Sequence, residues 1–266
     1  MIIPILMYHE IVQKEISVHP YAVSKDKFLR QLDFLKSSGY QTILLEELFQ
    51  IIKKDGFGPE KKIVITFDDT QLSNYTLALP LLKSYGFSGE FFIATQFIGK
   101  GKDLLEENHI KEMAKNQMSI QSHTHTHRFL NDLAPDQIYE ELEKSKDILQ
   151  DITGKKVSFF SCPGGRFTES VLEISKKMGY KAVCVSLPRV KWRSGKFPIL
   201  GRLIVSENTD FPTFEKMVKL EKKYIIKKEV EYTMKNAIKS LIGNDLYHRL
   251  WKLTKDESSQ KSREEK

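Results

Sequence analysis

This chain of 266 residues lacks the features that mark several large classes of protein. It has only two cysteines, Cys162 and Cys184, so a disulfide-linked scaffold is not indicated and two buried thiols are expected. No apolar run approaches the roughly 20 residues that a membrane-spanning helix needs. A Gly-x-Ser-x-Gly sequence is also missing, which disfavours a hydrolase with a serine triad. The length and the 40% of hydrophobic residues suffice for one large α/β domain with an extension.

The two ends of the chain also lack expected signals. Met1 leads directly into the apolar run Ile2–Met7 without a basic region or a cleavage site, which predicts a first strand and a cytoplasmic protein. The segment Thr213–Lys266 holds 14 Lys and Arg against nine Asp and Glu, and so carries most of the net charge of +7. It has no compact basic patch and no nucleic-acid fold signature, so no nucleic-acid partner is expected. An anionic surface at the inner face of the membrane, or a pyrophosphate-linked substrate, fits this charge.

Strand-like apolar runs alternate with segments of helical periodicity and are joined by short connections. Strands are expected at 2–8, 41–44, 62–67, 90–94, 118–122, 157–162, 181–186 and 197–205. Helices are expected at 25–38, 46–54, 77–85, 106–115, 135–151 and 169–178. This alternation predicts an α/β fold with a parallel sheet, either open or closed into a barrel, and functional residues at the carboxyl ends of its strands.

Two polar clusters follow such strands. The run Lys62–Phe67 ends in the carboxylates Asp68-Asp69, and the run Met118–Ser122 leads into His123 and His127. Adjacent carboxylates at the end of a buried strand repel each other and lose solvation, so they call for a cation or a function. Taken alone, the Asp pair is typical of a turn or helix cap, and the His pair of a surface loop. Together they predict a shared catalytic-type metal site of one Asp and two His, with positions open for water and substrate.

The same residues carry a resemblance. Thr66-Phe67-Asp68-Asp69, followed by His123-Thr124-x-x-His127, resembles the first two motifs of the polysaccharide deacetylase family, the NodB homology domain or carbohydrate esterase family 4. Ser161-Cys162-Pro163-Gly164-Gly165 resembles a degraded third motif, and Leu6-Met7-Tyr8-His9 resembles the start of one branch of the family. The resemblance covers about residues 2–205. It implies a distorted (β/α) barrel of about seven parallel strands.

The resemblance also implies roles for the motif residues. Asp69, His123 and His127 would bind a divalent metal, with zinc as the default for nitrogen and carboxylate ligands. Asp68 would be the general base that takes a proton from the attacking water. The metal would polarise an acetyl carbonyl and lower the pKa of bound water from about 15.7 towards about 7.

The general acid is harder to assign. The family usually supplies a His from a Leu-x-His motif near the end of the domain. Leu246-Tyr247-His248 matches this motif in letters but lies in a charged, helical stretch. His9 is the better candidate, because Ile5-Leu6-Met7-Tyr8-His9 resembles the missing motif moved to the front by circular permutation. The alternative for His9 is a strand-end histidine bonded to the backbone.

Other family features are altered. Ser161 stands where many members have the Arg that orients the base, and Thr70 stands where Gly usually follows the Asp pair. Arg166 or Arg202 can replace that Arg, and Arg202 is preferred; a substrate-facing Arg202 is the alternative. We group Arg202 with the loop Pro163-Gly164-Gly165 as candidate substrate-binding residues.

The expected organisation is a barrel at 1–211, a basic amphipathic helical extension at 212–253 and a disordered tail at 254–266. Gly243-Asn244 is expected to break the extension, which could pack on the barrel, bind a partner or lie on a membrane. The predicted function is metal-dependent removal of N-acetyl groups from an amino-sugar polysaccharide or a lipid- or nucleotide-linked glycan precursor. The alternatives are a catalytically silent carbohydrate-binding relative and a metal-dependent esterase or amidase with a non-sugar substrate.

Overall fold

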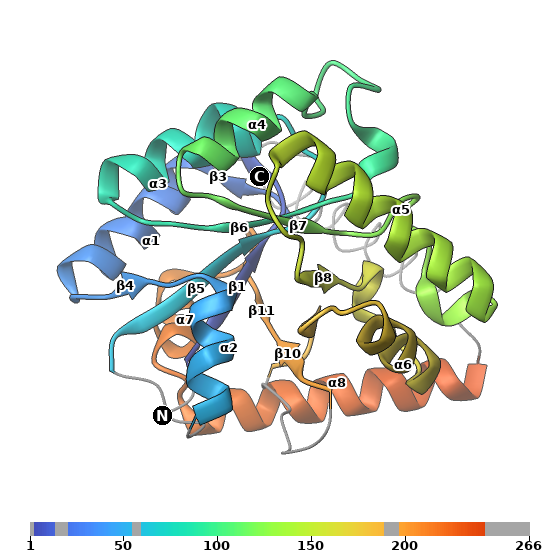
Figure 1. Cartoon of the computed structure of the whole chain (residues 1–266). Helices are drawn as coiled ribbons and strands as arrows, with labels where there is room; N and C mark the ends of the chain where they lie inside the picture. The colour runs from blue at the N-terminus through green and yellow to red at the C-terminus, as the bar shows by residue number, and fades with distance from the viewer. Residues whose placement is uncertain (1–2, 14–20, 55–59, 189–196, 243–266) are drawn as a thin grey trace, which may run out of the picture. The chain divides into compact units, whose positions relative to one another are not determined.

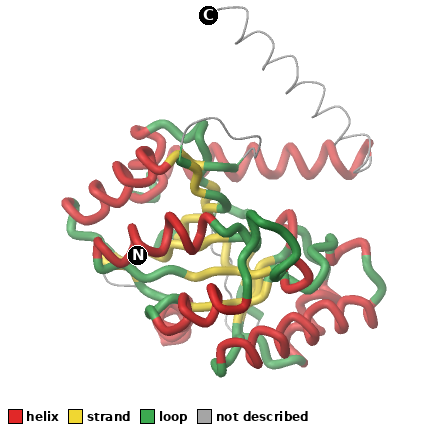
Figure 2. The backbone as a smooth tube through the Cα atoms, turned by 90° about the horizontal axis from the view of Figure 1, so that it is seen from above, coloured by secondary structure: helices red, strands yellow, loops and turns green. Residues whose placement is uncertain are grey.

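A sheet of short parallel strands forms the centre of the first of two compact units, residues 1–221. The computed structural model describes residues 3–13, 21–54, 60–188 and 197–242. The sheet has the order β10-β9-β8-β7-β6-β5-β1-β11, and Figures 1 and 2 show helices around it. Its strands are β1 (Ile5–Tyr8), β5 (Lys62–Phe67), β6 (Glu90–Ile93), β7 (Ser119–Ser122), β8 (Phe159–Ser161), β9 (Ala182–Val185), β10 (Ile199–Gly201) and β11 (Leu203–Ile204).

The two edges of this sheet meet at one short segment of the chain. β10 pairs with β9, β11 pairs with β1, and only Arg202 separates β10 from β11. Counted as one interrupted strand, this segment nearly closes the described sheet into a barrel of seven parallel strands, which confirms the predicted fold class. The continuous strand predicted over 197–205 is wrong, because the chain changes its pairing partner at Arg202.

Helices between the strands pack one apolar face on the sheet. In α1, Phe28, Leu32 and Leu35 are buried at the spacing of a helical turn. The residues that follow α1 and α3 include Gly39 and Gly86, whose φ angles of 77° and 69° suit glycine and end each helix as expected. The helices of this unit are α1 (Lys25–Ser37), α2 (Leu45–Lys54), α3 (Leu79–Tyr85, after a π-helical turn at Asn74–Ala78), α4 (Glu107–Lys115), α5 (Pro135–Thr153), α6 (Glu169–Lys177) and α7 (Phe211–Val218).

Short strands complete this unit outside the main path. β4 (Gln41–Thr42) pairs with the start of β5, and β2 (Ile11–Val12) pairs with β3 (Val23–Ser24) in a separate small sheet. β2 and β3 follow β1 and lead the chain into α1.

Helix α2 packs its apolar face into the core of the barrel. Leu45, Leu48 and Ile52 belong to one buried cluster with strand residues that include Val64 and Phe92. The first turn of α2 is held by Glu90, the first residue of β6, whose Oε1 accepts the N–H of Leu45 at 2.6 Å. The amino-terminal ends of the strands are therefore filled by packing, and the carboxyl-terminal ends carry the polar residues described below.

The chain beyond the barrel differs in detail from the expectation. The first compact unit ends at Glu221, not at residue 211, and includes α7, in which Phe214, Met217 and Val218 are buried. The second unit is described as the helix α8 (Lys222–Ile242). Gly243-Asn244, His248 and the tail 254–266 lie outside the described residues. No helix in the described part of the chain is both long enough and apolar enough to cross a membrane.

Candidate active site and metal centre

The sequence-predicted site residues gather at the carboxyl ends of the strands. Asp68-Asp69 follows β5, and His123 and His127 follow β7, two strands away in the sheet. β1 lies on the other side of β5, and the pairing of Tyr8 with Phe67 places His9 level with Asp68. Because parallel strands all end at the same edge, residues far apart in the chain meet here.

Asp69, His123 and His127 form one cluster of potential metal ligands. The Oδ1 atom of Asp69 lies 3.5 Å from Nε2 of His123 and 3.3 Å from Nε2 of His127, and the two Nε2 atoms are 3.2 Å apart. Ligands of a tetrahedral ion with bonds of about 2.0–2.2 Å stand about 3.3–3.5 Å apart. The donor set therefore fits a divalent metal such as zinc, and these three residues would hold it.

The ring of His123 is oriented for such a role. Its Nδ1 lies 2.9 Å from the carbonyl oxygen of Ser161, so the Nδ1–H tautomer donates there and leaves Nε2 facing the cluster. Burial lowers the pKa of His123, which favours the neutral imidazole. At His127, burial acts to lower the pKa as well, but the hydrogen bond and charge of Asp69 raise it overall. Neutral His123 is the form that ligates a metal.

Unusual backbone conformations support the cluster. Asp69, Thr124 and His127 have φ angles of 70°, 65° and 62°, in the left-handed region that non-glycine residues rarely adopt. Each such residue costs on the order of 1–3 kcal/mol and tends to occur at functional sites. Thr70, which replaces the usual Gly, pins this turn: its hydroxyl donates to the carbonyl of Ala94 at 3.0 Å and accepts the N–H of Ala94 at 3.1 Å.

Glu141 of α5 holds the histidine loop from outside. Its Oε2 accepts the backbone N–H groups of His125 at 2.9 Å and Thr126 at 2.8 Å, and its Oε1 accepts the hydroxyl of Thr126. Glu141 is buried, and its partners His125 and Thr126 lie between the two ligands in the loop. Three hydrogen bonds to one carboxylate thus fix the loop that spaces His123 from His127.

Asp68 is locked by a buried guanidinium. Arg202 donates through Nη1 to Oδ1 of Asp68 at 2.6 Å and through Nη2 to Oδ2 at 2.7 Å, and Ser161 donates its hydroxyl to Oδ2 at 2.9 Å. Burial alone would raise the pKa of Asp68, but the charges of Arg202 and His123 outweigh it and lower the pKa to about 2. Asp68 is therefore an oriented carboxylate at neutral pH.

Arg202 does not face substrate, so its grouping with the substrate-binding residues is wrong. It is 1% exposed, and its guanidinium lies 5.1 Å from the ring centre of Phe92. It also donates to the hydroxyl of Thr66 at 3.1 Å. Ser161 carries no charge, so Arg202 supplies the positive charge beside Asp68. Ser161 bridges the two residues, because its hydroxyl donates to Asp68 and accepts from Arg202 Nη2 at 2.7 Å. This geometry agrees with the preference for Arg202 over Arg166 as the residue that replaces the missing motif Arg.

His9 and the Pro163–Gly165 loop lie at the same end of the barrel. The His9 ring stacks on Tyr21 with 4.8 Å between centroids, and its charge contributes to lowering the pKa of Asp68 and Asp69. Pro163–Gly165 forms a short 3-10 turn after β8. At Gly164, with φ of 62°, a Cβ atom would come within 2.8 Å of the Phe129 ring. The guanidinium of Arg166 also lies over the Phe129 ring, with 4.1 Å between its Cζ and the ring centroid. Phe129 and this loop therefore form one packed rim.

Sequence reasoning missed several supporting residues. Glu141, Thr66 and Ser161 received no role, although Glu141 carries a signal: it is a carboxylate on the buried face of α5 that includes Ile138 and Leu142. Buried charges on an apolar helix face need partners, so this position pointed to an anchoring role. His125, which lies between the two candidate ligands in the sequence, pairs its Nδ1 with the hydroxyl of Thr95 at 2.9 Å.

Comparison with known proteins identifies the same family as the sequence motifs. The sequence profile of the family described as "Polysaccharide deacetylase" matches residues 55–183. YxkH of Bacillus subtilis (strain 168), named as a polysaccharide deacetylase, is 35% identical over 204 residues, which cover 77% of this chain and 71% of YxkH. The poly-beta-1,6-N-acetyl-D-glucosamine N-deacetylase of Staphylococcus aureus (strain MSSA476) is 30% identical over 177 residues, and the match spans only 60% of its length.

A solved structure is similar over most of the barrel. The deacetylase PplD of Streptococcus pyogenes, in complex with acetate, superposes with a TM-score of 0.74 at 27% identity, covering 81% of this chain and 97% of PplD. The sequence match to YxkH and the structural match to PplD each cover more than three quarters of this chain. This chain belongs to the polysaccharide deacetylase family of hydrolases.

Proposed function

We propose that the protein is a metal-dependent hydrolase that removes N-acetyl groups from an amino-sugar glycan. The observation that carries this proposal is the pairing of two sets: the ligand cluster of Asp69, His123 and His127, and the carboxylate Asp68 beside it, 3.8 Å from Nε2 of His123. A silent binding relative would not need Asp68 held by three hydrogen bonds from Arg202 and Ser161.

The residues divide the chemistry between them. A divalent cation held by the Asp and two His supplies Lewis acidity to an acetyl carbonyl and makes a water more acidic. Asp68 accepts a proton from that water, and Arg202 keeps both carboxylate oxygens in place for it. Because Arg202 holds the pKa of Asp68 to about 2, Asp68 is a well-oriented but weak base that acts only on an acidified water.

His9 is proposed as the general acid. The amine that leaves during amide hydrolysis must be protonated, and the pairing of β1 with β5 places His9 level with Asp68. Its ring is only partly buried and is supported by the ring of Tyr21. A histidine at this place can carry a proton near neutral pH, which Asp68 cannot.

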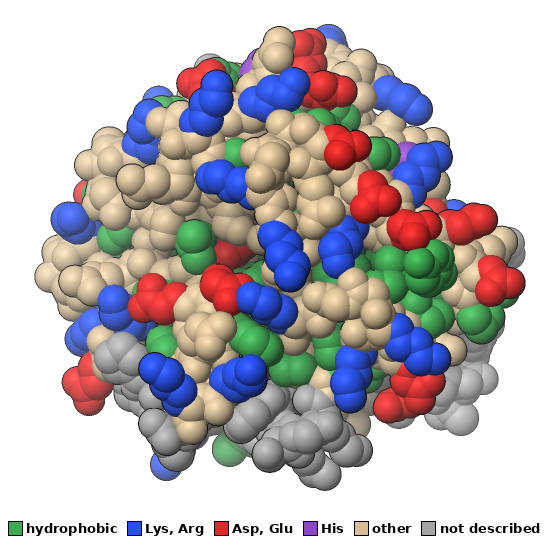
Figure 3. Space-filling model, in the orientation of Figure 1, with side chains coloured by type: hydrophobic (Ala, Val, Ile, Leu, Met, Phe, Trp, Pro, Cys, Tyr) green, Lys and Arg blue, Asp and Glu red, His purple; other side chains and the backbone are tan. Residues whose placement is uncertain are grey.

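The glycan is proposed from the relatives and from the surface. The Staphylococcus aureus relative acts on poly-beta-1,6-N-acetyl-D-glucosamine, and the Streptococcus pyogenes relative was solved with acetate, the acid that N-deacetylation releases. On the face drawn in Figure 3, basic and acidic side chains are interspersed. The rim of Pro163–Gly165 and Phe129 is the proposed contact for its sugar rings.

The test compares an amide with an activated ester. Zinc-loaded protein is assayed for acetate release from N-acetylglucosamine oligomers and for hydrolysis of 4-nitrophenyl acetate, whose leaving group needs no proton. Asp68→Asn is expected to lower both rates, by roughly 10²–10⁴-fold, while His9→Ala lowers only the amide rate. His109→Ala, a histidine on α4, is the control.

The outcomes separate the parts of the proposal. Ester hydrolysis without acetate release from any oligomer would point to a non-sugar substrate. Equal loss of both rates in His9→Ala would end its assignment as the acid. Absence of bound zinc after reconstitution, measured by titration, would overturn the metal-dependent hydrolase.

We also propose that the protein works in the cytoplasm at the inner membrane face, on a lipid-linked glycan precursor. Support comes from α8, whose 21 residues include six lysines and two glutamates. Ile226, Val230 and Met234 are exposed and spaced four residues apart along it. The protein is expected to sediment with vesicles that contain phosphatidylserine and not with phosphatidylcholine vesicles. Equal sedimentation with both at low salt would contradict this.

A further inference from the structure

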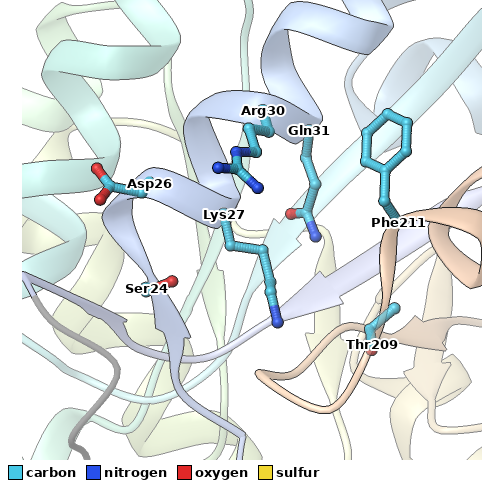
Figure 4. Close-up of a pocket in the computed structure, with 7 residues that line it drawn as sticks. All are labelled: Ser24, Asp26, Lys27, Arg30, Gln31, Thr209 and Phe211. Carbon is cyan, nitrogen blue, oxygen red and sulfur yellow. The ribbon is translucent and has the colours of Figure 1, made fainter.

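A cavity lies apart from the metal centre, between the first turns of α1 and the segment that leads into α7. Its volume is about 200 Å³. Figure 4 shows the side chains that line it, which come from Ser24 to Gln31 on one side and from Thr209 and Phe211 on the other. None of these residues belongs to the metal centre or to the catalytic set. The volume suits a small ligand of about the size of one sugar ring, below the range of drug-sized pockets.

Two charged groups in the cavity are not used by the fold. Asp26 and Arg30 lie one helical turn apart on α1, and both line the cavity. Within the described part of the chain, neither forms a hydrogen bond or an ion pair. Their carboxylate and guanidinium groups are each planar and each able to form paired hydrogen bonds with two neighbouring groups of a ligand.

Gln31 adds an amide whose oxygen is hydrogen-bonded to a described residue and whose nitrogen is not. It is 1% exposed, and its Oε1 accepts the hydroxyl of Tyr8 at 2.8 Å. This bond fixes the amide, so Nε2 points away from Tyr8, and no described residue accepts a hydrogen bond from it. Figure 4 shows the side chain extending into the cavity beside Lys27. The amide N–H group is therefore available to donate to an oxygen of a ligand in the cavity.

The charges around the cavity balance. Lys27 lies 3.0 Å from the carboxylate of Glu207 and also donates to its backbone carbonyl, so its charge is neutralised by the fold. Asp26 and Arg30 contribute one charge of each sign to the lining. A phosphate or carboxylate ligand would meet as many negative as positive groups. The lining therefore favours an uncharged ligand with many hydroxyl groups.

Phe211 gives the cavity an apolar wall. Its side chain is 42% exposed, and its ring meets that of Phe34 edge-on at 5.5 Å, which holds it in place. A fixed aromatic ring beside planar polar groups suits a sugar, which has an apolar C–H face and a polar rim. We propose that this cavity binds one uncharged sugar unit of the glycan, distinct from the unit that is deacetylated; the identity of the glycan rests on the proposed function.

The cavity and the catalytic carboxylate share the end of β1. The carbonyl of Tyr8 accepts the N–H of Asp68 at 2.9 Å, and the hydroxyl of the same residue donates to Gln31. Tyr8 thus connects the cavity to the carboxylate. If the cavity binds a second sugar unit, oligomers are expected to be better substrates than single sugars.

Binding to a catalytically silenced protein is the first test. A pentamer of β-1,6-linked N-acetylglucosamine is titrated calorimetrically into zinc-loaded Asp68→Asn protein. Adding Arg30→Ala or Phe211→Ala is expected to weaken binding about tenfold or to remove one of two binding events. Tyr139→Ala and Lys115→Ala, exposed positions on α5 and α4, are matched controls. Arg30→Gln and Phe211→Leu repeat the test if an alanine variant is unstable.

Turnover separates failure of this inference from failure of the proposed function. In active protein, the ratio of kcat/KM for the pentamer to that for 4-nitrophenyl acetate is expected to fall about tenfold in Arg30→Ala. Unchanged binding and an unchanged ratio, with acetate still released, would overturn the sugar site and leave the function intact. Weakened binding in a protein that releases no acetate would support the site and count against the function. Competition by millimolar inorganic phosphate would assign an anion and overturn the uncharged ligand.

Discussion

Single residues in this site depend on partners far away in the chain. Asp68 is fully enclosed, and its charge is tolerated because Arg202, 134 residues later, presents both guanidinium nitrogens to it. Neither group could be buried alone at acceptable cost, since an isolated buried charge is costly and would shift its pKa instead. The pair is therefore a structural requirement, apart from the catalytic role proposed for Asp68.

Removal of Arg202 alone should destabilise the protein. In Arg202→Met the carboxylate of Asp68 stays buried without its partner, and the free energy of unfolding is expected to fall by about 3–5 kcal/mol. The double variant Asp68→Asn with Arg202→Met should recover most of this loss, because no charge is left unpaired. Urea unfolding of the parent protein and the two variants measures the difference. Equal stability of the single and double variants would show that the pair contributes little.

Loss of the Glu141 charge should weaken metal binding without removing a ligand. Glu141→Gln keeps the size of the side chain but can accept through only one oxygen, so the loop of His123 and His127 is held less firmly. Zinc affinity, measured by titration of the metal-free protein, is expected to fall roughly 10–100-fold. Glu140→Gln, its exposed neighbour on α5, should bind zinc as the parent protein does. Identical affinities would limit Glu141 to a role in stability.

How far the sequence reveals these residues depends on their separation in the chain. Asp68-Asp69 and the His123–His127 pair each form a local motif at the end of a strand, so their meeting follows from the parallel sheet alone. Arg202 could be proposed only as one of two candidates, because its contact with Asp68 depends on how the barrel closes. Its burial was not predictable, since an arginine after an apolar run is usually exposed.

Secondary-structure elements act in the site mainly through their ends. β5 matches its predicted range of 62–67, because a continuous β-branched apolar run has few other uses. α2 is set in place by Glu90, a carboxylate on a strand that accepts from the first turn of the helix. Burial raises the pKa of Glu90 to about 7, from an ordinary value near 4.5.

The stability of the barrel should therefore fall as the pH rises through the titration of Glu90. Folded protein holds this proton up to about pH 7, whereas the unfolded chain releases it near pH 4.5, so the folded state binds more protons between these values. The loss amounts to about 3 kcal/mol across this window. Glu90→Gln should lack the decline and be more stable than the parent above pH 7.

Urea unfolding of parent and variant from pH 4.5 to 8 checks this. Glu47→Gln, an exposed position on α2, is the control and should follow the parent curve. Parallel curves for Glu90→Gln and the parent would mean that the buried carboxylate is ionised throughout.

At the scale of the whole molecule, the barrel contains all of its own closing contacts. β1 pairs with β11 and β9 with β10 within residues 1–221, and α7 buries its apolar face in the same unit. The predicted boundary at 211 assigned α7 to the extension. The reason is that α7 is followed directly by a basic segment, and the sequence pattern does not separate the two. The proposed site residues all lie before the division at Glu221.

A chain that ends at Glu221 should therefore fold and bind zinc. Its Tm is expected within about 4 °C of that of the full chain, which corresponds to about 1 kcal/mol for a unit of this size. Thermal unfolding followed by circular dichroism and a zinc titration test this, with the full chain as reference. The shortened chain should also fail to sediment with anionic vesicles. Loss of cooperative unfolding would show that the second unit is needed for the barrel.

The position of Arg202 between β10 and β11 has a consequence for biosynthesis. The same residue that joins the last strand to the first also pairs with Asp68, the proposed base, and both contacts require a segment that is made after almost the whole barrel. A nascent or truncated chain that stops before residue 202 carries the three proposed metal ligands but no counter-charge for Asp68. The proposed base is therefore held in place only in a chain whose barrel has been completed.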